Sequence, residues 1–268
     1  MSRVRRVAGV LLATASLYTS VVLADSPSPF ISSIAIERAS GATGALPESL
    51  TATLHVSDPA RTAASLSHIA ELDVVSTGDA SVRVRFGPRP TLASPADERF
   101  LRSTWVVDFA EDAVRSLATG FANPDGARPT PAELEHFVFD HIDDKTYSRS
   151  FDLASRVAAM RQGDCTEHAV LLTALARING YSARIVFGNV IIDIDDGLFA
   201  YGHAWTEIYD GESWRILDAT MVPGDAEPAR TRYLPIGFLG DEGPGYVLSM
   251  FELVNAMPTR ISDVRGSP

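Results

Sequence analysis

The chain contains a single cysteine, Cys165, and the surrounding sequence favours a reactive thiol. Asp164 precedes it, Glu167 follows two residues later, and the run AVLLTALARI comes next. This pattern predicts a helix with Asp164 as its N-cap and Glu167 completing a capping box. Unpaired amides and the positive dipole end at a helix start stabilise an anion, which lowers the pKa of a thiol there. Because the thiolate is the form that attacks carbonyl carbon, we predict that Cys165 is a nucleophile.

A histidine and an aspartate downstream are suited to assist such a nucleophile. His203 begins the strand-like run HAWTEIY, and Asp218 lies in the next strand-like run. A two-residue turn at Asp210–Gly211 would place His203 opposite Asp218, whereas a four-residue loop would make them diagonal neighbours on one face. A carboxylate that accepts an imidazole N–H orients the ring and stabilises the imidazolium. We therefore predict His203 as the base and Asp218 as the orienting group.

Each of these residues also has a plainer interpretation. A histidine–aspartate pair alone is an ordinary cross-strand contact, and a lone cysteine can be an inert core residue or form an intermolecular disulfide. The combination of Cys165 at a helix start with His203 and Asp218 favours catalysis. His168 is a rival base, but no sequence feature orients it, so we assign it a packing role.

The elements that position these residues follow from periodicity and capping. The helix after Cys165 is apolar nearly all round, which is typical of a helix in the middle of a core. The sequence after it is rich in Val, Ile, Trp and Tyr and predicts consecutive antiparallel strands. The expected strands are residues 182–194, 201–209 and 213–220. The expected helices are residues 112–117, a capping-box helix starting at Pro131, residues 153–161 with a cap at Asp152, and residues 246–255, the last within a tail that is otherwise loop.

The first part of the mature chain has a different character. Residues 50–56 and 81–86 alternate as half-buried strands do, and residues 62–72 are compatible with a short helix. We predict a small β-rich N-terminal module over residues 25–96, without chemistry of its own, followed by a catalytic domain over residues 97–268. The fold class is therefore α+β.

At this point the motifs resemble a known family. The runs RQGDCTEHAVLLTALARINGYSARIVFG and GHAWTEIYDGESWRILDAT are similar to the core of the transglutaminase-like superfamily, with its Gly-x-Cys, His-Ala-Trp and Asp-x-Thr elements in order. The resemblance covers about residues 100–220. It implies a papain-like core in which a central helix, with the cysteine at its N-terminus, packs on an antiparallel sheet. It also implies a Cys165–His203–Asp218 triad.

The same resemblance implies acyl transfer at an amide carbonyl through a thioester. Water as acceptor gives a cysteine peptidase or amidase, and an amine gives a cross-linking enzyme; we favour hydrolysis, because no feature marks an amine pocket. Tyr147, Gln162 or Trp205 are expected to line the cleft or the oxyanion site, and the backbone N–H of Cys165 is expected to contact the oxyanion. The alternatives are a non-catalytic protein-binding module on the same fold and an envelope protein dimerising through Cys165.

Composition excludes several classes of function. Hydrophobic residues make up 46% and charged residues 21%, which predicts a packed core. The formal charge of −11 is the opposite of the basic surface that nucleic-acid binding needs, and Lys145 is the only lysine. No Cys/His set has zinc spacing and no Gly-rich loop follows a strand, so we expect no metal and no cofactor. The expected partner is a protein or peptide substrate, and the oligomeric state is left open.

The N-terminus has the pattern of a secretory signal peptide. Three arginines precede an apolar run from Val7 to Leu23. The run is followed by Ala24, and residues 22–24 have the small or β-branched residues that a signal peptidase reads. We expect residues 1–24 to be removed and the protein to be exported to the periplasm, the cell envelope or the medium. The apolar run is short for a bilayer span, so we expect no stable membrane span after cleavage; an uncleaved anchor is the alternative.

Overall fold

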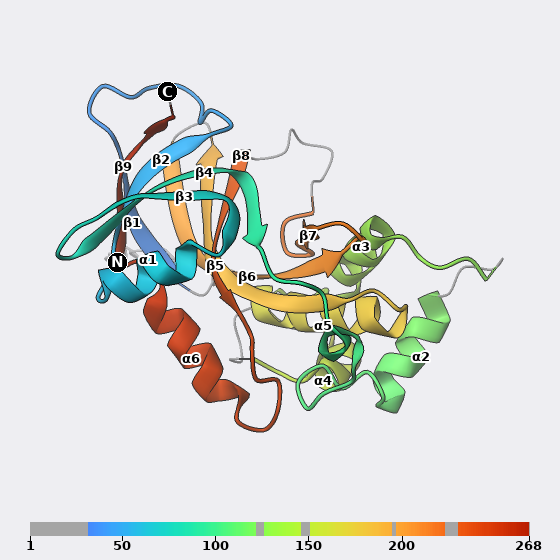
Figure 1. Cartoon of the computed structure of the whole chain (residues 1–268). Coiled ribbons are helices and arrows are strands. Elements are labelled where there is room, and N and C mark those ends of the chain that lie inside the picture. Colours follow the sequence, from blue (N-terminus) through green and yellow to red (C-terminus); the bar gives the residue numbers. More distant parts are fainter. Residues whose placement is uncertain (1–31, 122–125, 146–150, 195–196, 223–229, 268) are drawn as a thin grey trace, which may run out of the picture.

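The computed structural model describes residues 32–121, 126–145, 151–194, 197–222 and 230–267 (Figure 1). Its strands are β1 (Ser32–Arg38), β2 (Leu50–His55), β3 (Ile69–Thr77), β4 (Ser81–Leu92), β5 (Ala183–Ile194), β6 (Gly197–Tyr209), β7 (Trp214–Leu217), β8 (Arg230–Phe238) and β9 (Arg260–Gly266). Its helices are α1 (Pro59–Leu66), the 3₁₀ turn η1 (Glu98–Leu101), α2 (Asp112–Phe121), α3 (Pro131–His141), α4 (Ala154–Met160), α5 (Cys165–Ile178) and α6 (Tyr246–Ala256). None of these helices combines the length and apolarity needed to cross a bilayer. The predicted signal peptide lies outside the described residues.

The strands form one curled sheet of nine strands within the described residues, which confirms the α+β class. Its order is β3-β4-β2-β9-β1-β6-β5-β8, and β7 pairs with β6 beside this path. The predicted run of consecutive antiparallel strands is confirmed, because β5 pairs with β6 and β6 pairs with β7. Figure 1 shows α2, α3, α4 and α5 gathered near β6 and β7, and α1 with α6 at the other end of the sheet.

Helix α5 is the centre of the core. Every residue of α5 except Ile178 is buried. The helix packs on β6, where the Thr206 hydroxyl donates to the Ala169 carbonyl at 2.9 Å and lies 3.1 Å from the Thr173 hydroxyl. The helix ends before Gly180, whose φ of +77° is the left-handed conformation that glycine adopts readily. The predicted central helix is confirmed.

The opposite face of the β5–β6 hairpin is buried as well. A second apolar cluster lies there, and it contains Val186, Val190, Ile192, Trp205, Ile216 and Tyr233. Burial on both faces explains why apolar residues occur on both faces of β5 instead of on alternate positions only. The candidate catalytic strand β6 is therefore held from both sides.

Two elements predicted before α5 are wrong in detail. The expected helix over residues 62–72 is α1, which ends at Leu66, followed by strand β3. Asp152 does not cap α4, because Leu153 is the N-cap residue and no side chain caps it. The Asp152 N–H instead donates to Glu167, which draws this residue toward α5.

The tail after Met221 is not simply loop and helix. It contains β8, which pairs with β5, and β9, which lies between β2 and β1. Pro235 lacks an N–H, and a proline inside a run argues against a strand, so the sequence does not predict β8. The register of the β8–β5 pairing shifts at this proline. The partners of β9 lie at the far N-terminal end of the chain, so no local pattern indicates them.

The N-terminal region continues the sheet of the rest of the chain. Strand β1 pairs antiparallel with β6, at Ser32↔Gly202, and parallel with β9. The second half of β4 lies against β7 and β8 (Figure 1). The division into residues 25–96 and 97–268 stays a proposal.

Candidate active site

Cys165 is the first residue of α5, as the sequence predicts. The Asp164 carboxylate accepts the N–H of Thr166 at 2.8 Å, and Glu167 Oε2 accepts the N–H of Asp164 at 3.0 Å. The predicted capping box is thus present and fixes the backbone that carries the thiol. The Cys165 side chain is fully buried. A substrate carbonyl can therefore reach Sγ only after neighbouring groups move.

Glu167 ties the segment before α4 to the start of α5. Its Oε1 accepts the N–H of Asp152 at 2.9 Å, and burial together with the charge of Asp164 raises the pKa of Glu167 to about 8. Gly163 makes room for this side chain, since a Cβ on Gly163 would lie 2.2 Å from the Glu167 Cβ. Glycine at this position is thus required by close packing next to Cys165.

The surroundings of Cys165 raise the pKa of its thiol well above the ordinary value. Burial is the largest cause, and the charge of Asp164 is the next. A backbone hydrogen bond from Ala204 lowers the pKa, whereas Asp218 and Glu167 raise it. The predicted lowering of this pKa is wrong, because burial and nearby acidic groups raise it. The thiol proton therefore requires a neighbouring base.

His203 and Asp218 form a buried pair. His203 Nε2–H donates to Asp218 Oδ2 at 2.8 Å, and the two side chains are 0% and 4% exposed. Strand β7 pairs with β6 at Tyr209↔Trp214, so residues 210–213 form a four-residue connection. The two-residue turn is wrong, and the alternative with His203 and Asp218 as diagonal neighbours is the arrangement found.

This pair lies next to Cys165. Ala204, which follows His203 on β6, supplies the backbone hydrogen bond to the thiol, and the charge of Asp218 acts on the same thiol. Burial alone would raise the pKa of Asp218, but His203, Tyr233 and the Thr220 N–H together hold it below its ordinary value. Asp218 is therefore a carboxylate at neutral pH. The three residues predicted as a triad are close together, and their roles are taken up as a proposal below.

The predicted cleft residues lie in different environments. Gln162 is half-buried in the segment that leads into α5 and is bridged to Asp144. Trp205 is buried; its ring lies 6.2 Å from the His203 ring and 5.2 Å from the Tyr233 ring, centroid to centroid. Tyr147 lies outside the described residues. The roles of all three stay predictions.

The absence of a side chain at Gly188 leaves space for the Trp205 ring next to His203. Gly188 is paired with His203 in the register of β5 and β6. A Cβ on Gly188 would lie 2.7 Å from the Trp205 ring and 2.3 Å from the Leu234 carbonyl oxygen. Any larger residue would push Trp205 or β8 away from the candidate site.

His168, the rival base, is fixed in the core. Its Nδ1–H donates to the Asp164 carbonyl at 2.6 Å. Burial, with a further contribution from the charge of Lys145, lowers the pKa of His168 to about 4. A neutral, hydrogen-bonded imidazole supports the packing role assigned from the sequence.

Three groups hold Asp218, and two of them, Tyr233 and Glu135, were not singled out by the sequence analysis. The Tyr233 hydroxyl donates to Asp218 Oδ2 at 2.9 Å, and the Thr220 N–H donates to Oδ1 at 3.0 Å. The Asp218 N–H donates to Glu135 Oε1 at 2.5 Å. Glu135 lies on α3 and Tyr233 on β8, so their approach to Asp218 is a matter of tertiary packing that no motif signals.

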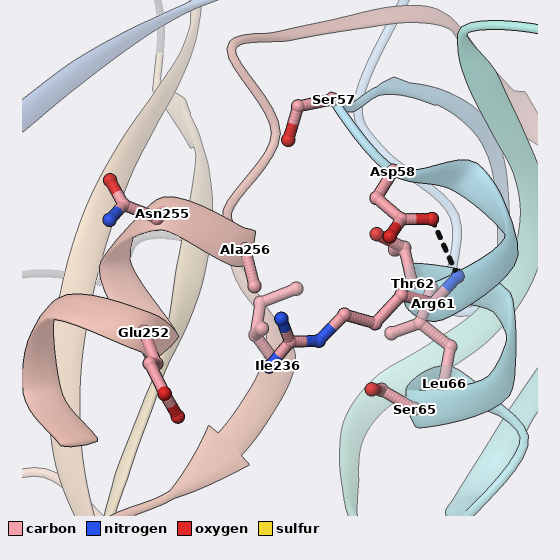
Figure 2. A pocket seen from close by; sticks show the side chains of 10 residues that line it. All are labelled: Ser57, Asp58, Arg61, Thr62, Ser65, Leu66, Ile236, Glu252, Asn255 and Ala256. Atoms are coloured by element: carbon pink, nitrogen blue, oxygen red, sulfur yellow. Dashed lines mark hydrogen bonds between the residues drawn. The ribbon is translucent and has the colours of Figure 1, made fainter.

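A pocket of about 210 Å³ lies elsewhere, between α1 and α6 (Figure 2). Its lining includes Asp58 and Arg61 of α1 and its cap, and Glu252 and Asn255 of α6. Asp58 is already engaged, since its carboxylate accepts the Arg61 N–H at 3.0 Å. None of the predicted site residues lines this pocket, so it is separate from the candidate active site.

A buried helix that starts with a cysteine, packed on antiparallel strands that carry a histidine–aspartate pair, is typical of papain-like thiol folds. Residues 115–219 match the sequence model of the transglutaminase-like superfamily. This match confirms the resemblance to that superfamily that the motifs predict. The matched range contains Cys165, His203 and Asp218.

Solved structures give more distant likenesses. One is a candidate cysteine protease from Cytophaga hutchinsonii, with 16% identity over 83% of this chain and 82% of that chain and a TM-score of 0.41. Another is the periplasmic domain of TgpA from Pseudomonas aeruginosa bound to ethylmercury, with 18% identity over 56% of this chain and 65% of that chain and a TM-score of 0.39. No curated protein matches the sequence.

Proposed function

We propose that the chain is a cysteine-dependent acyl-transfer enzyme acting on peptide or side-chain amide bonds. Cys165 is the nucleophile, His203 the base and Asp218 the group that orients His203. The observation that carries the proposal is the buried hydrogen bond of 2.8 Å between His203 and Asp218, next to a cysteine at the start of α5. The superfamily match over residues 115–219 supports the same assignment.

In the first step the S–H bond of Cys165 breaks and its proton passes to the His203 ring nitrogen that does not contact Asp218. The sulfur forms a bond to the amide carbon, and the carbonyl oxygen becomes an oxyanion. The Cys165 N–H has no intrahelical acceptor, because it lies in the first turn, and we assign it to this oxyanion. Asp218 stabilises the imidazolium, which offsets the raised pKa of the thiol.

In the second step the C–N bond breaks, and the leaving amine takes the proton from His203. A thioester on Cys165 remains. Water or an amine then attacks the thioester carbon, His203 accepts the proton of the attacking group, and the proton returns to the sulfur as the thioester C–S bond breaks. We favour water, which makes the enzyme a peptidase or amidase.

A protein-binding module on the same fold is the second candidate function. The full burial of the Cys165 side chain favours it, because a buried thiol is not immediately open to a substrate. All three members of the proposed triad are nevertheless present, and an inactive relative has no need of them.

The activated ester p-nitrophenyl acetate tests the thioester step. We expect release of p-nitrophenolate and an acetyl group on Cys165, detected by mass spectrometry of the intact chain and its peptides. The Cys165→Ala variant is the control and is expected to release only the background amount. Added glycine methyl ester will divert the acetyl group if amines are the preferred acceptors. A folded wild-type chain that acquires no acetyl group on Cys165 would favour the binding module.

We also propose that the protein is exported. The support is the N-terminal pattern, in which three arginines precede an apolar run ending near Ala24. N-terminal sequencing of the protein from cells that express the full chain is expected to start at Asp25. A protein that keeps its first residues would indicate the uncleaved anchor instead.

A further inference from the structure

Asp218 Oδ2 accepts two hydrogen bonds. One comes from His203 Nε2 at 2.8 Å, and the other from the Tyr233 hydroxyl at 2.9 Å. Tyr233 is 3% exposed, and burial and the charge of Asp218 raise the pKa of its hydroxyl well above the ordinary value. Tyr233 therefore remains a neutral donor whenever Asp218 is charged. Two donors on one oxygen restrict where the carboxylate can lie.

Arg89 on β4 holds Tyr233 from the side of the N-terminal region. Its guanidinium carbon lies 5.1 Å from the centre of the Tyr233 ring. Its Nη2–H donates to the Ile216 carbonyl at 2.9 Å, two residues before Asp218. Trp205 packs edge-on against the Tyr233 ring at 5.2 Å. Arg89 thus contacts both the strand that leads to Asp218 and the ring that donates to it.

We propose that Tyr233 and Arg89 are positioning residues of the His203–Asp218 pair, so that β4 of the N-terminal region is part of the active site. This inference rests on the proposed function. It also gives the N-terminal region a role, since β4 pairs with β2 and β3 and also lies against β7 and β8 (Figure 1).

The proposal makes the charge of Asp218 depend on Tyr233. Hydrogen bonds to the charged form of a carboxyl group favour that form, and each pKa unit is a tenfold change in equilibrium. Loss of the Tyr233 hydroxyl would let Asp218 accept a proton at higher pH, and the imidazolium would then lose its partner. The titratable groups that face Asp218 or interact with it by charge are Glu135 (α3), Cys165 and His168 (α5), His203 (β6) and Tyr233 (β8). The charge of Arg89 (β4) acts on Tyr233 and Glu135.

The test is the rate of Cys165 alkylation by iodoacetamide as a function of pH. In Tyr233→Phe the ring and its packing remain and only the hydroxyl is lost. We expect the pH at which reactivity is half lost on acidification to rise by about one unit. Tyr181→Phe is the matched control: its hydroxyl donates to the Pro129 carbonyl at 3.0 Å, away from Asp218, and its profile should coincide with that of the wild type.

Arg89 is tested in the same assay. Arg89→Ala is expected to move the profile in the same direction by a smaller amount, and Arg89→Lys to keep part of the effect, because lysine keeps the charge but not the planar contact. Because Arg89 acts through Tyr233, the double variant should shift little beyond Tyr233→Phe alone. Arg85→Ala on the same strand, whose partner is Asp73, is the control and should cause no shift. If Arg89→Ala does not fold, the pH profile of Arg89→Lys is compared with that of the wild type instead.

The outcomes separate this inference from the proposed function. Unshifted profiles in Tyr233→Phe and the Arg89 variants, with reactivity still lost in His203→Ala, would overturn the inference and leave the proposed function standing. Equal reactivity of folded wild type and His203→Ala at every pH would remove the proposed function, and the inference with it.

Discussion

Alkylation of Cys165 by iodoacetamide at pH 7 is expected to slow on the order of 10³-fold when His203 is replaced by alanine. Burial and the charges of Asp164 and Asp218 oppose formation of the thiolate. In the proposed mechanism the His203 imidazole of the wild type takes the proton and becomes a cation beside the sulfur. Without it the thiol must ionise alone, so the variant should regain reactivity only at pH values above the ordinary thiol pKa.

The control for this prediction is another histidine. His141 Nε2 lies 2.9 Å from the Ala158 carbonyl, at the end of α3, and His141→Ala should alkylate at the wild-type rate. Near-ultraviolet circular dichroism will show whether each variant keeps its packing. A folded His203→Ala chain that reacts as fast as wild type would show that His203 is not the base.

The second large effect is expected in stability. Arg184 on β5 and Glu207 on β6 form an ion pair in which both side chains are 0% exposed, with Arg184 Nε and Nη2 donating to Glu207 Oε2 at 2.9 and 2.6 Å. Arg184 also donates to the Leu92 carbonyl and lies over the Trp214 ring at 3.8 Å. Glu207→Ala would leave this guanidinium buried without a counter-charge. We expect the free energy of unfolding to fall by about 3–5 kcal/mol, measured by urea denaturation.

Burying the Arg184–Glu207 pair costs free energy, so a variant in which both residues are apolar serves as the control. Burial lowers the pKa of Arg184 and raises that of Glu207 to about 7, so it outweighs their mutual attraction. The double change Arg184→Met with Glu207→Leu should therefore recover most of the loss. Asp73→Ala breaks a comparable cross-strand pair with Arg85 whose side chains are 64% and 50% exposed, and should cost less than about 1 kcal/mol. Equal losses at the two pairs would contradict this account.

Local sequence was sufficient to predict the helix that begins at Cys165. Capping at Asp164 and Glu167, the apolar run after them and the stop at Gly180 involve residues a few positions apart, and the structure contains each of them. The proximity of His203 and Asp218 could also be predicted from nearby sequence, because two strands joined by a short connection pair with each other. Even the error in the turn at residues 210–213 moved the pairing by two and kept both side chains on one face.

The chemistry of the site depended on contacts that no short segment contains. The thiol pKa was predicted in the wrong direction, because the helix dipole is a local property whereas burial and the approach of Asp218 arise only when α5 packs against the sheet. Tyr233 reaches Asp218 from β8, and Arg89 of β4, more than a hundred positions earlier in sequence, lies over the Tyr233 ring. Pairings between strands so far apart are stabilised by the whole core rather than by their own residues, so periodicity and turn signals cannot indicate them.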